Sequence, residues 1–172
     1  GDVYKRQVVM NAGAYGGEMK DILQKVTVLT PDGTVQTLSV EELELSYRHS
    51  IIPEKGYLVI SAVLKLQPGN ADEIQSIMDD LKEKRVSKQP LEYPSAGSTF
   101  KRPEGYFAGK LIQDAGLRGF RVGGAQVSEK HCGFIINRDQ ATSTDICQLM
   151  QQVSEIVYEK FGVRLEPEVK KI

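Results

Sequence analysis

Runs of apolar residues at strand spacing and at helix spacing divide the chain into alternating segments. The segments KVTVL at 25–29 and TVQTL at 34–38 flank Pro31-Asp32-Gly33, a turn sequence, and so predict a β-hairpin. The most apolar and β-branched stretch, YLVISAVLKLQP, begins at Tyr57 and predicts a buried strand. Further extended segments are expected at 119–127, 132–137 and 163–169.

Apolar residues at helical spacing predict three helices. The first covers residues 71–84, and we expect its apolar stripe to be buried core and not a cofactor site. That stripe consists of Ile74, Ile77, Met78 and Leu81. The second covers residues 106–115 and ends at Gly116, with Leu111 and Ile112 facing inward. The third runs from a Thr142-Ser143 cap to Phe161, before Gly162. Its apolar face carries Ile146, Leu149, Met150, Val153, Val157 and Phe161.

The order of these segments favours an α+β fold. Strands, helices and a hairpin follow one another without the strict strand–helix repeat of a doubly wound sheet. Pro68-Gly69-Asn70 marks a boundary, and 172 residues suffice for one ordinary domain or two small ones.

Composition and charge exclude several classes of partner. Lys plus Arg is 22 and Asp plus Glu is 23, so the net charge of −1 predicts neither a nucleic-acid partner nor an anionic membrane. Apolar runs fall short of the ~18 residues of a spanning helix, and no signal peptide opens the chain. Cys132 and Cys147 have no metal-site spacing; we expect core thiols in a reducing cytoplasm and no metal.

Two small-residue segments are candidates for chemistry. YPSAGSTFKRP at 93–103 leaves Ser98 on a backbone that another molecule can approach closely, although serines there also serve to satisfy turn backbone groups. NAGAYGG at 11–17 can aim N–H groups at phosphate oxygens, although it also fits a tight turn. Arg48, beside the predicted buried strand, needs a carboxylate partner from the protein or a ligand.

Four separated segments together resemble one family. They are NAGAYGGEM at 11–19, YRHS at 47–50, the region from YPSAGSTFKRP to HCGFIIN at 93–137, and LEPEV at 165–169. In this combination the chain resembles the UDP-N-acetylenolpyruvoylglucosamine reductases, the MurB flavoenzymes of peptidoglycan precursor synthesis. The resemblance implies a cytoplasmic enzyme in which NADPH reduces FAD, and hydride then passes to UDP-N-acetylglucosamine enolpyruvate, giving UDP-N-acetylmuramate.

The resemblance assigns roles to three residues. Ser98 matches the family's proton donor, whereas Arg48 and Glu168 match groups that bind and polarise the substrate carboxylate. Hydride arriving at the vinyl carbon leaves negative charge beside that carboxylate, so a fixed guanidinium would stabilise it by ~3 kcal/mol. Glu168 would help most as a neutral acid that donates to the enolate.

Further residues carry over from the same resemblance. Backbone contacts to FAD are expected from Asn11, Ala12 and Gly13. Substrate contacts are expected from Tyr47, Lys101, Arg102 and His131, of which the last three match residues that hold the uridine diphosphate. A lone loop histidine such as His131 is more often simply exposed.

The start of the chain departs from the family pattern. GDVYKRQ at 1–7 stands where the family has a phosphate loop, and we interpret it as a non-native scar. We therefore expect part of an FAD-binding domain at 8–67, a complete substrate-binding domain at 68–162, and a tail at 163–172 that returns to the flavin side. The alternative function is a non-catalytic UDP-sugar-binding fragment, because the first FAD subdomain is missing.

Overall fold

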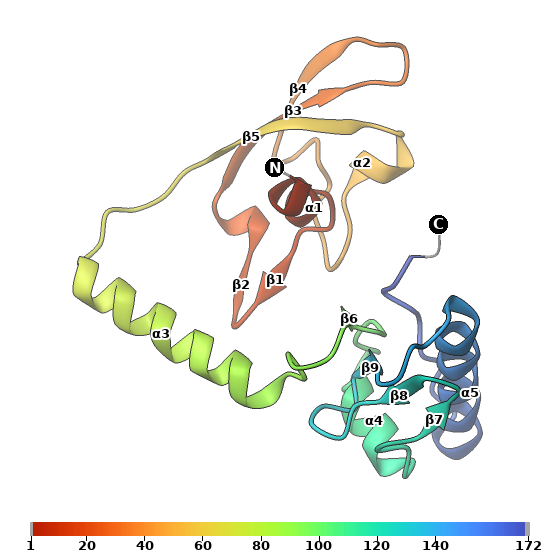
Figure 1. Cartoon of the computed structure of the whole chain (residues 1–172). Coiled ribbons are helices and arrows are strands. Elements are labelled where there is room, and N and C mark those ends of the chain that lie inside the picture. Colours follow the sequence, from red (N-terminus) through yellow and green to blue (C-terminus); the bar gives the residue numbers. More distant parts are fainter. Residues whose placement is uncertain (1, 171–172) are drawn as a thin grey trace. The chain divides into compact units, whose positions relative to one another are not determined.

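The computed structural model describes residues 2–170, with the backbone alone for residues 2–4. The chain forms two compact units, which meet in sequence between Asn70 and Ala71 (Figure 1). We call them unit 1 and unit 2. Each has a hydrophobic core of its own.

Unit 1 is built around a three-stranded antiparallel sheet with the strand order β4-β3-β5. Its elements are α1 (Asp2–Val9), β1 (Gly13–Ala14), β2 (Gly17–Glu18), the 3₁₀ helix η1 (Met19–Asp21), β3 (Leu23–Leu29), β4 (Val35–Ser39), α2 (Ile51–Glu54) and β5 (Leu58–Leu64). The predicted hairpin is confirmed as β3 and β4, with Leu29 opposite Val35. Its turn includes Gly33 at a left-handed φ of 84°, which glycine adopts without strain.

The start of the chain is helical where an irregular scar was expected. Helix α1 includes most of residues 1–7, of which residue 1 lies outside the described part, and it continues into Val8, which is buried in the core of unit 1. The non-native origin of this segment stays a prediction. The rest of that core consists of Leu23, Val26, Val28, Leu38, Leu43, Ile52 and Val59.

The prediction of a buried strand from Tyr57 is right about the strand and wrong about its burial. In β5 only Val59 is buried, whereas Leu58 is 65% exposed and Ile60 45% exposed. β5 is an edge strand of the sheet, and no element in the described part of the chain covers its other apolar side chains. An apolar run shows that a strand can be buried, but a covering element decides whether it is.

Unit 2 contains a four-stranded antiparallel sheet with the strand order β6-β9-β8-β7. Its elements are α3 (Ala71–Lys88), β6 (Ser95–Ser98), α4 (Ala108–Asp114), β7 (Arg121–Val122), β8 (Ala125–Val127), β9 (Phe134–Asn137) and α5 (Ser143–Phe161). The single strand expected at 119–127 is a hairpin instead. Gly123 and Gly124 form its turn, and a Cβ on Gly124 would lie 2.0 Å from the Asp139 carbonyl oxygen.

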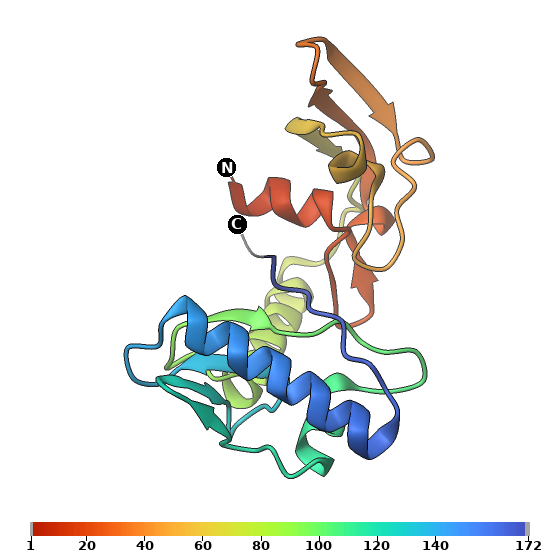
Figure 2. The ribbon, with the colours of Figure 1, turned by 90° about the vertical axis from the view of Figure 1, so that its right-hand side faces the viewer.

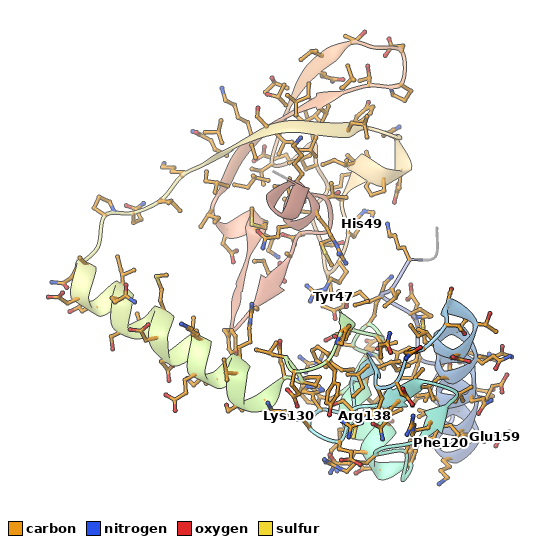
Figure 3. The ribbon with its side chains drawn as sticks, in the orientation of Figure 1. Tyr47, His49, Phe120, Lys130, Arg138 and Glu159 are labelled. Atoms are coloured by element: carbon orange, nitrogen blue, oxygen red, sulfur yellow. The ribbon has the colours of Figure 1, made fainter. Side chains whose placement is uncertain are left out.

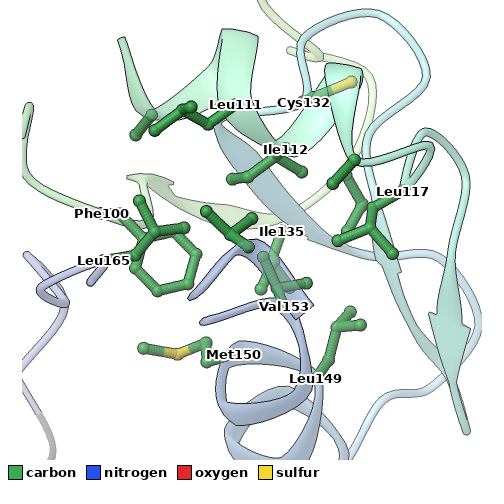
Figure 4. Packing of buried hydrophobic residues seen from close by; sticks show 14 of the residues in the cluster. Phe100, Leu111, Ile112, Leu117, Cys132, Ile135, Leu149, Met150, Val153 and Leu165 are labelled. Atoms are coloured by element: carbon green, nitrogen blue, oxygen red, sulfur yellow. The ribbon is translucent and has the colours of Figure 1, made fainter. Parts of the chain in front are cut away.

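Helix α5 lies across the sheet of unit 2 and supplies much of its core (Figure 2). Leu149, Met150 and Val153 of α5 are buried against Phe100, Ile112, Ile135 and Leu165 (Figure 4). The Thr142 cap is confirmed, because its hydroxyl accepts from the Asp145 backbone N–H at 3.1 Å while the Asp145 carboxylate accepts from the Thr142 N–H. Gly162 ends the helix at a φ of 69°, as expected. Phe161, assigned to the buried face, is 41% exposed.

The other predicted helices differ in their outcome. α4 has Leu111 and Ile112 buried and ends at Asp114, with Ala115 as its C-cap before Gly116. α3 forms over a longer range than predicted, but it has no buried residue, and Ile77 is 60% exposed. The interpretation of its apolar stripe as core is therefore wrong, since the spacing that defines an apolar face does not provide a surface for it to pack on.

Candidate functional site

Arg48 lies in a tight, strained turn of unit 1. The Ser46 N–H donates to the His49 carbonyl at 3.3 Å, and the His49 N–H donates to the Ser46 carbonyl at 3.2 Å. Arg48 has a φ of 55°, a left-handed conformation that arginine rarely adopts. Its guanidinium carbon lies 5.2 Å from the ring centre of Tyr47, on the same turn as His49 (Figure 3). Strain of this kind is kept where neighbouring structure enforces it, commonly at functional sites.

The Asn11 side chain connects this turn to the Gly-rich segment. Asn11 is only 1% exposed, and its Nδ2 donates to Glu18 Oε2 at 3.0 Å and to the Ser46 carbonyl at 3.1 Å. Its Oδ1 accepts from the Lys20 backbone N–H at 2.9 Å. Both hydrogens and one lone pair of the amide are therefore in use within the protein.

Glu18 places a negative charge in the same region. Its carboxylate pairs with Lys20 Nζ at 2.9 Å. Hydrogen bonds from Lys20 and Asn11 hold the pKa of Glu18 below its ordinary value of 4.5, and the charges of Lys20 and Arg48 act in the same direction. Glu18 is thus held by Asn11 and Lys20, and sequence analysis did not identify it as part of this region.

The Gly-rich segment 11–17 is a β-hairpin. β1 and β2 pair, and the two residues between them, Tyr15 and Gly16, have φ values of 52° and 87°, as a type I′ turn requires. A Cβ on Gly13 would lie 2.9 Å from Glu18 Cγ, so the hairpin itself needs this glycine. The tight-turn interpretation of the segment thus accounts for Gly13 and Gly16.

The expected flavin contacts fit this hairpin only in part. The Asn11 N–H donates to the Val8 carbonyl at 3.1 Å and the Ala12 N–H to the Gln7 carbonyl at 2.8 Å, so neither is directed at a phosphate. Ala12 and Gly13 are half-buried and small, which fits the approach of a flat ring. The expectation for Asn11 concerns its backbone and stays a prediction; its side chain is buried and hydrogen bonded within the protein.

Ser98 lies at the end of strand β6 of unit 2 and is exposed. It pairs with Phe134 of β9, and the register shifts between Ser95 and Ser98, where Gly97 has a φ of 87°. The segment, whose residues suggested turn backbone, thus includes a strand with a shift of register. Bulges re-aim side chains next to functional sites.

Backbone pairing brings Glu168 to the residue that follows Ser98. The Glu168 N–H donates to the Thr99 carbonyl at 2.9 Å, and the Lys101 N–H donates to the Glu166 carbonyl at 2.8 Å. Thr99 is itself buried, and its hydroxyl accepts from the Ile135 N–H at 3.0 Å. The tail is thus fixed onto the strand that carries Ser98. Two of the three predicted catalytic residues are gathered in unit 2, and Arg48 belongs to unit 1.

The residues predicted to hold a diphosphate have contacts within unit 2. Lys101 Nζ forms an ion pair with Glu166, and the Arg102 guanidinium lies 4.0 Å from the ring centre of Phe107. Both side chains lie next to the Ser98 strand in sequence. Arg102 and Phe107 are exposed, so they present a cation and an aromatic surface to solvent.

His131 is half-buried, not simply exposed. Its Nδ1 accepts from the Gly133 N–H at 3.0 Å, so in the neutral ring Nε2 carries the hydrogen. Its ring meets Phe134 edge to face at 5.0 Å, and burial lowers the pKa of His131 below its ordinary value of 6.5. A Cβ on Gly109 of α4 would lie 3.2 Å from His131 Cε1. This glycine inside a predicted helix was the sequence signal of a close approach, and it was missed.

Residues 2–170 contain neither a metal-binding cluster nor a helix that could span a membrane. No group of three or more His, Cys, Asp or Glu side chains in this range could hold a metal ion. No helix in the same range is long and apolar enough to cross a membrane.

Comparison with known proteins identifies the family. Residues 89–172 match the family model described as "UDP-N-acetylenolpyruvoylglucosamine reductase, C-terminal domain". Proteins with that reductase name from Agathobacter rectalis and Clostridioides difficile are 66% and 58% identical over 165 and 163 residues. These alignments cover 96% and 95% of this chain but 52% and 54% of the relatives. The crystal structure of the reductase (MurB) from Thermus caldophilus superposes with a TM-score of 0.82 at 38% identity, covering 97% of this chain and 60% of that one.

Unit 2 from residue 89 on is thus the C-terminal domain of a reductase of this type. The chain belongs to the UDP-N-acetylenolpyruvoylglucosamine reductase family, which confirms the resemblance seen in the sequence. It spans about half the length of the curated relatives it matches.

Proposed function

We propose that this chain is the substrate-handling part of an FAD- and NADPH-dependent oxidoreductase that reduces UDP-N-acetylglucosamine enolpyruvate to UDP-N-acetylmuramate. Such an enzyme acts in the cytoplasm and supports cell-wall synthesis, and through it cell shape and division. The observation that carries the proposal is the pairing of the tail with the Ser98 strand, which holds Glu168 beside Thr99.

Unit 1 supplies the cation for the substrate carboxylate in this proposal. Arg48 has a planar guanidinium whose paired N–H groups match a carboxylate. Its strained turn holds the backbone of Arg48, and therefore the direction of its Cα–Cβ bond, in one conformation. Charge that develops beside the carboxylate is stabilised by the same cation. When bound, FAD would supply the hydride. We assign unit 1 to the FAD-binding domain, in which Ala12 and Gly13 would contact the flavin ring.

Unit 2 supplies the proton in this proposal. Ser98 donates from Oγ to the carbon next to the carboxylate after hydride has arrived at the terminal carbon, which converts the vinyl group into a methyl group on a CH centre. Glu168 is half-buried, and as a neutral carboxylic acid it donates a hydrogen bond to the enolate. The hydroxyl of Ser98 then regains a proton from solvent, because Ser98 is exposed.

The uridine diphosphate is assigned to the residues around the Ser98 strand. Arg102 faces solvent on Phe107 and can contact the diphosphate. Lys101 contributes only if the diphosphate displaces its partner Glu166. The neutral His131 can donate from Nε2 to a sugar or phosphate oxygen.

Half-reactions of the full-length parent enzyme test the role of Ser98. Ser98→Ala should leave FAD reduction by NADPH unchanged and should slow reoxidation by substrate by about 10²-fold or more, as expected for loss of a proton donor. Stopped-flow flavin absorbance measures both steps, and Ser95→Ala, three residues earlier on the same strand, is the matched control. Equal loss in both half-reactions would refute the assignment.

A second candidate, a UDP-sugar-binding module without catalysis, is favoured by one observation. Unit 2 has a complete core of its own, with fifteen buried residues. Calorimetry of this 172-residue chain with UDP-N-acetylglucosamine, beside an absorbance scan for bound flavin, separates the candidates. Nucleotide-sugar binding without flavin favours the module for this chain.

A further inference from the structure

Only one orientation of the Asn11 side-chain amide allows hydrogen bonds to all three of its neighbouring groups. Its Nδ2 faces two acceptors, Glu18 Oε2 and the Ser46 carbonyl, and its Oδ1 faces a donor, the Lys20 N–H. Turning the amide over would set oxygen against both acceptors and nitrogen against the donor. A carboxylate or an apolar side chain of the same size would likewise leave some of these partners without their hydrogen bond to position 11.

Asn11 acts on the turn that carries Arg48. The Ser46 carbonyl accepts from both the His49 N–H that closes the turn and the Asn11 Nδ2, so both of its lone pairs are engaged. Such external support is what allows a non-glycine residue to stay at a φ of 55°. Asn11 is itself left-handed at a φ of 44°, a conformation that asparagine tolerates better than arginine does.

Asn11 also hydrogen bonds to the Glu18 carboxylate, whose pKa the charge of Arg48 helps to lower. Glu18 accepts from Asn11 and from Lys20, which together determine where its charge lies. The charge of Arg48 is among those that lower the pKa of Glu18, so the two groups interact. One buried amide thus contacts both the turn that carries Arg48 and a carboxylate whose pKa the charge of Arg48 helps to lower.

We propose that Asn11 is the positioning residue of Arg48, acting through the Ser46 carbonyl and the Glu18 carboxylate, and is not a cofactor contact. This rests on the proposed function, because it takes Arg48 as the group that binds the substrate carboxylate. The effect of Asn11 should therefore fall on the use of substrate and not on FAD.

Steady-state and half-reaction kinetics of the full-length parent test this role. Asn11→Ala and Asn11→Asp should raise the KM for UDP-N-acetylglucosamine enolpyruvate and slow reoxidation of the flavin by about tenfold or more. FAD content and flavin reduction by NADPH should stay unchanged. Asn11→Asp should be the more severe, because it sets a second carboxylate against Glu18. Gln24→Ala, an exposed amide in the same unit, is the control.

A rescue experiment separates positioning from simple loss of folding. In Asn11→Asp/Glu18→Gln the polarity of the hydrogen bond is reversed, since the new amide can donate to the new carboxylate. This double variant should recover part of the lost substrate reoxidation, while Asn11→Asp/Glu44→Gln, which removes an exposed charge elsewhere in unit 1, should not. Absence of any recovery in the first pair would overturn the proposal.

A measurement on the 172-residue chain needs no cofactor. Carboxyl carbon NMR should find the pKa of Glu18 below 4.5, rising toward that value in Asn11→Ala. An unchanged Glu18 pKa in folded Asn11→Ala would contradict the proposal. Glu18→Gln, which keeps an oxygen acceptor for Asn11, provides a second variant and should shift the Arg48 Nε–H resonance.

The outcomes distinguish the two proposals. If Arg48→Lys leaves reoxidation by substrate intact, the proposed function fails at Arg48. If Arg48→Lys abolishes it but the Asn11 variants do not, the positioning role alone fails. Loss of bound FAD in Asn11→Ala with an unchanged substrate KM would make Asn11 a cofactor contact and would overturn the inference.

Discussion

The Arg48 turn of unit 1 and the Ser98 strand of unit 2 are held in place by different means. Ser98 lies in a ladder of backbone pairs, with β9 through Phe134 and with the tail through Thr99. The Arg48 turn is closed by two backbone hydrogen bonds between Ser46 and His49 and is supported from outside by one buried side chain, Asn11. Backbone ladders tolerate changes of side chain, whereas the outside support of the Arg48 turn depends on the Asn11 amide.

The two units also differ in the size of their hydrophobic cores. Fifteen buried residues form the core of unit 2, but eight form that of unit 1, where most of β5 stays exposed. A smaller core provides less stability to hold a strained residue. Substitutions in the two units should therefore have separable effects, and the following predictions test that difference in order of size.

The largest effect is expected from Leu149→Ala in the core of unit 2. Leu149 is fully buried, so its truncation should lower the free energy of unfolding of unit 2 by about 3 kcal/mol. Urea unfolding followed by NMR signals from both units measures it. Ile77→Ala on the exposed stripe of α3 should change the same free energy by less than about 0.5 kcal/mol. A loss at Ile77 as large as at Leu149 would show that α3 is covered.

A smaller effect is expected in unit 1 from Gly13→Ala. The new Cβ would lie 2.9 Å from Glu18 Cγ and 3.2 Å from the Gly17 carbonyl oxygen, so the hairpin must shift, at a cost of about 1–2 kcal/mol. Gly17→Ala is the matched control, because its Cβ would meet nothing within 4 Å. Thermal unfolding of unit 1 should separate the two. Equal melting temperatures would contradict the packing described for Glu18.

The capping box of α5 should contribute less. Thr142→Ala removes the hydroxyl that accepts from the Asp145 N–H and should cost about 1 kcal/mol in unit 2. Thr144→Ala, an exposed change within the first turn, should cost much less. Urea midpoints of the two variants provide the test, and identical midpoints would exclude a role for the cap.

The smallest effect is a difference in pH dependence between the units. The pKa of His131 is lower in the folded state than in the unfolded chain, so the folded state binds fewer protons at this residue. The contribution of His131 to the stability of unit 2 is therefore lost as pH falls below 6.5. The pKa of Glu18 in unit 1 is also lowered, so its contribution is present above 4.5 and is lost below that value. Between pH 7.5 and 5, unit 2 should therefore weaken first. Amide hydrogen exchange of unit 2 measures this loss of stability, and His131→Gln should remove it. The same pH dependence in His131→Gln as in the unchanged chain would contradict the prediction.

Local sequence signals predicted much of the fold. The β3–β4 turn, the Thr142 cap and the Gly162 stop were all predictable, because each is decided by residues adjacent in sequence. The exposure of β5 and α3 was not predictable, since burial depends on what covers a face. The bulge at Gly97 was also missed, because small residues in YPSAGSTFKRP are compatible with both a loop and an irregular strand.

The candidate site was predictable in its residues but not in its connections. The family resemblance identified Arg48, Ser98 and Glu168, whose proposed roles stay predictions. The pairing of Glu168 with Thr99 joins segments far apart in the chain, which no local pattern reveals. The role proposed for the Asn11 side chain depends on three partners, of which Ser46 is distant in sequence, so no local pattern could indicate it.

The central proposal is that Arg48 and Ser98 serve the same step of the reduction. A double-mutant cycle with Arg48→Lys and Ser98→Ala in the full-length parent, followed by flavin reoxidation with UDP-N-acetylglucosamine enolpyruvate, tests it most directly. We predict that the double variant is far less impaired than the product of the two single losses, because each single change already disables the same step. The account would be contradicted if the rate of flavin reoxidation in the double variant fell by the product of the two single effects. It would also be contradicted if neither single variant reduced that rate.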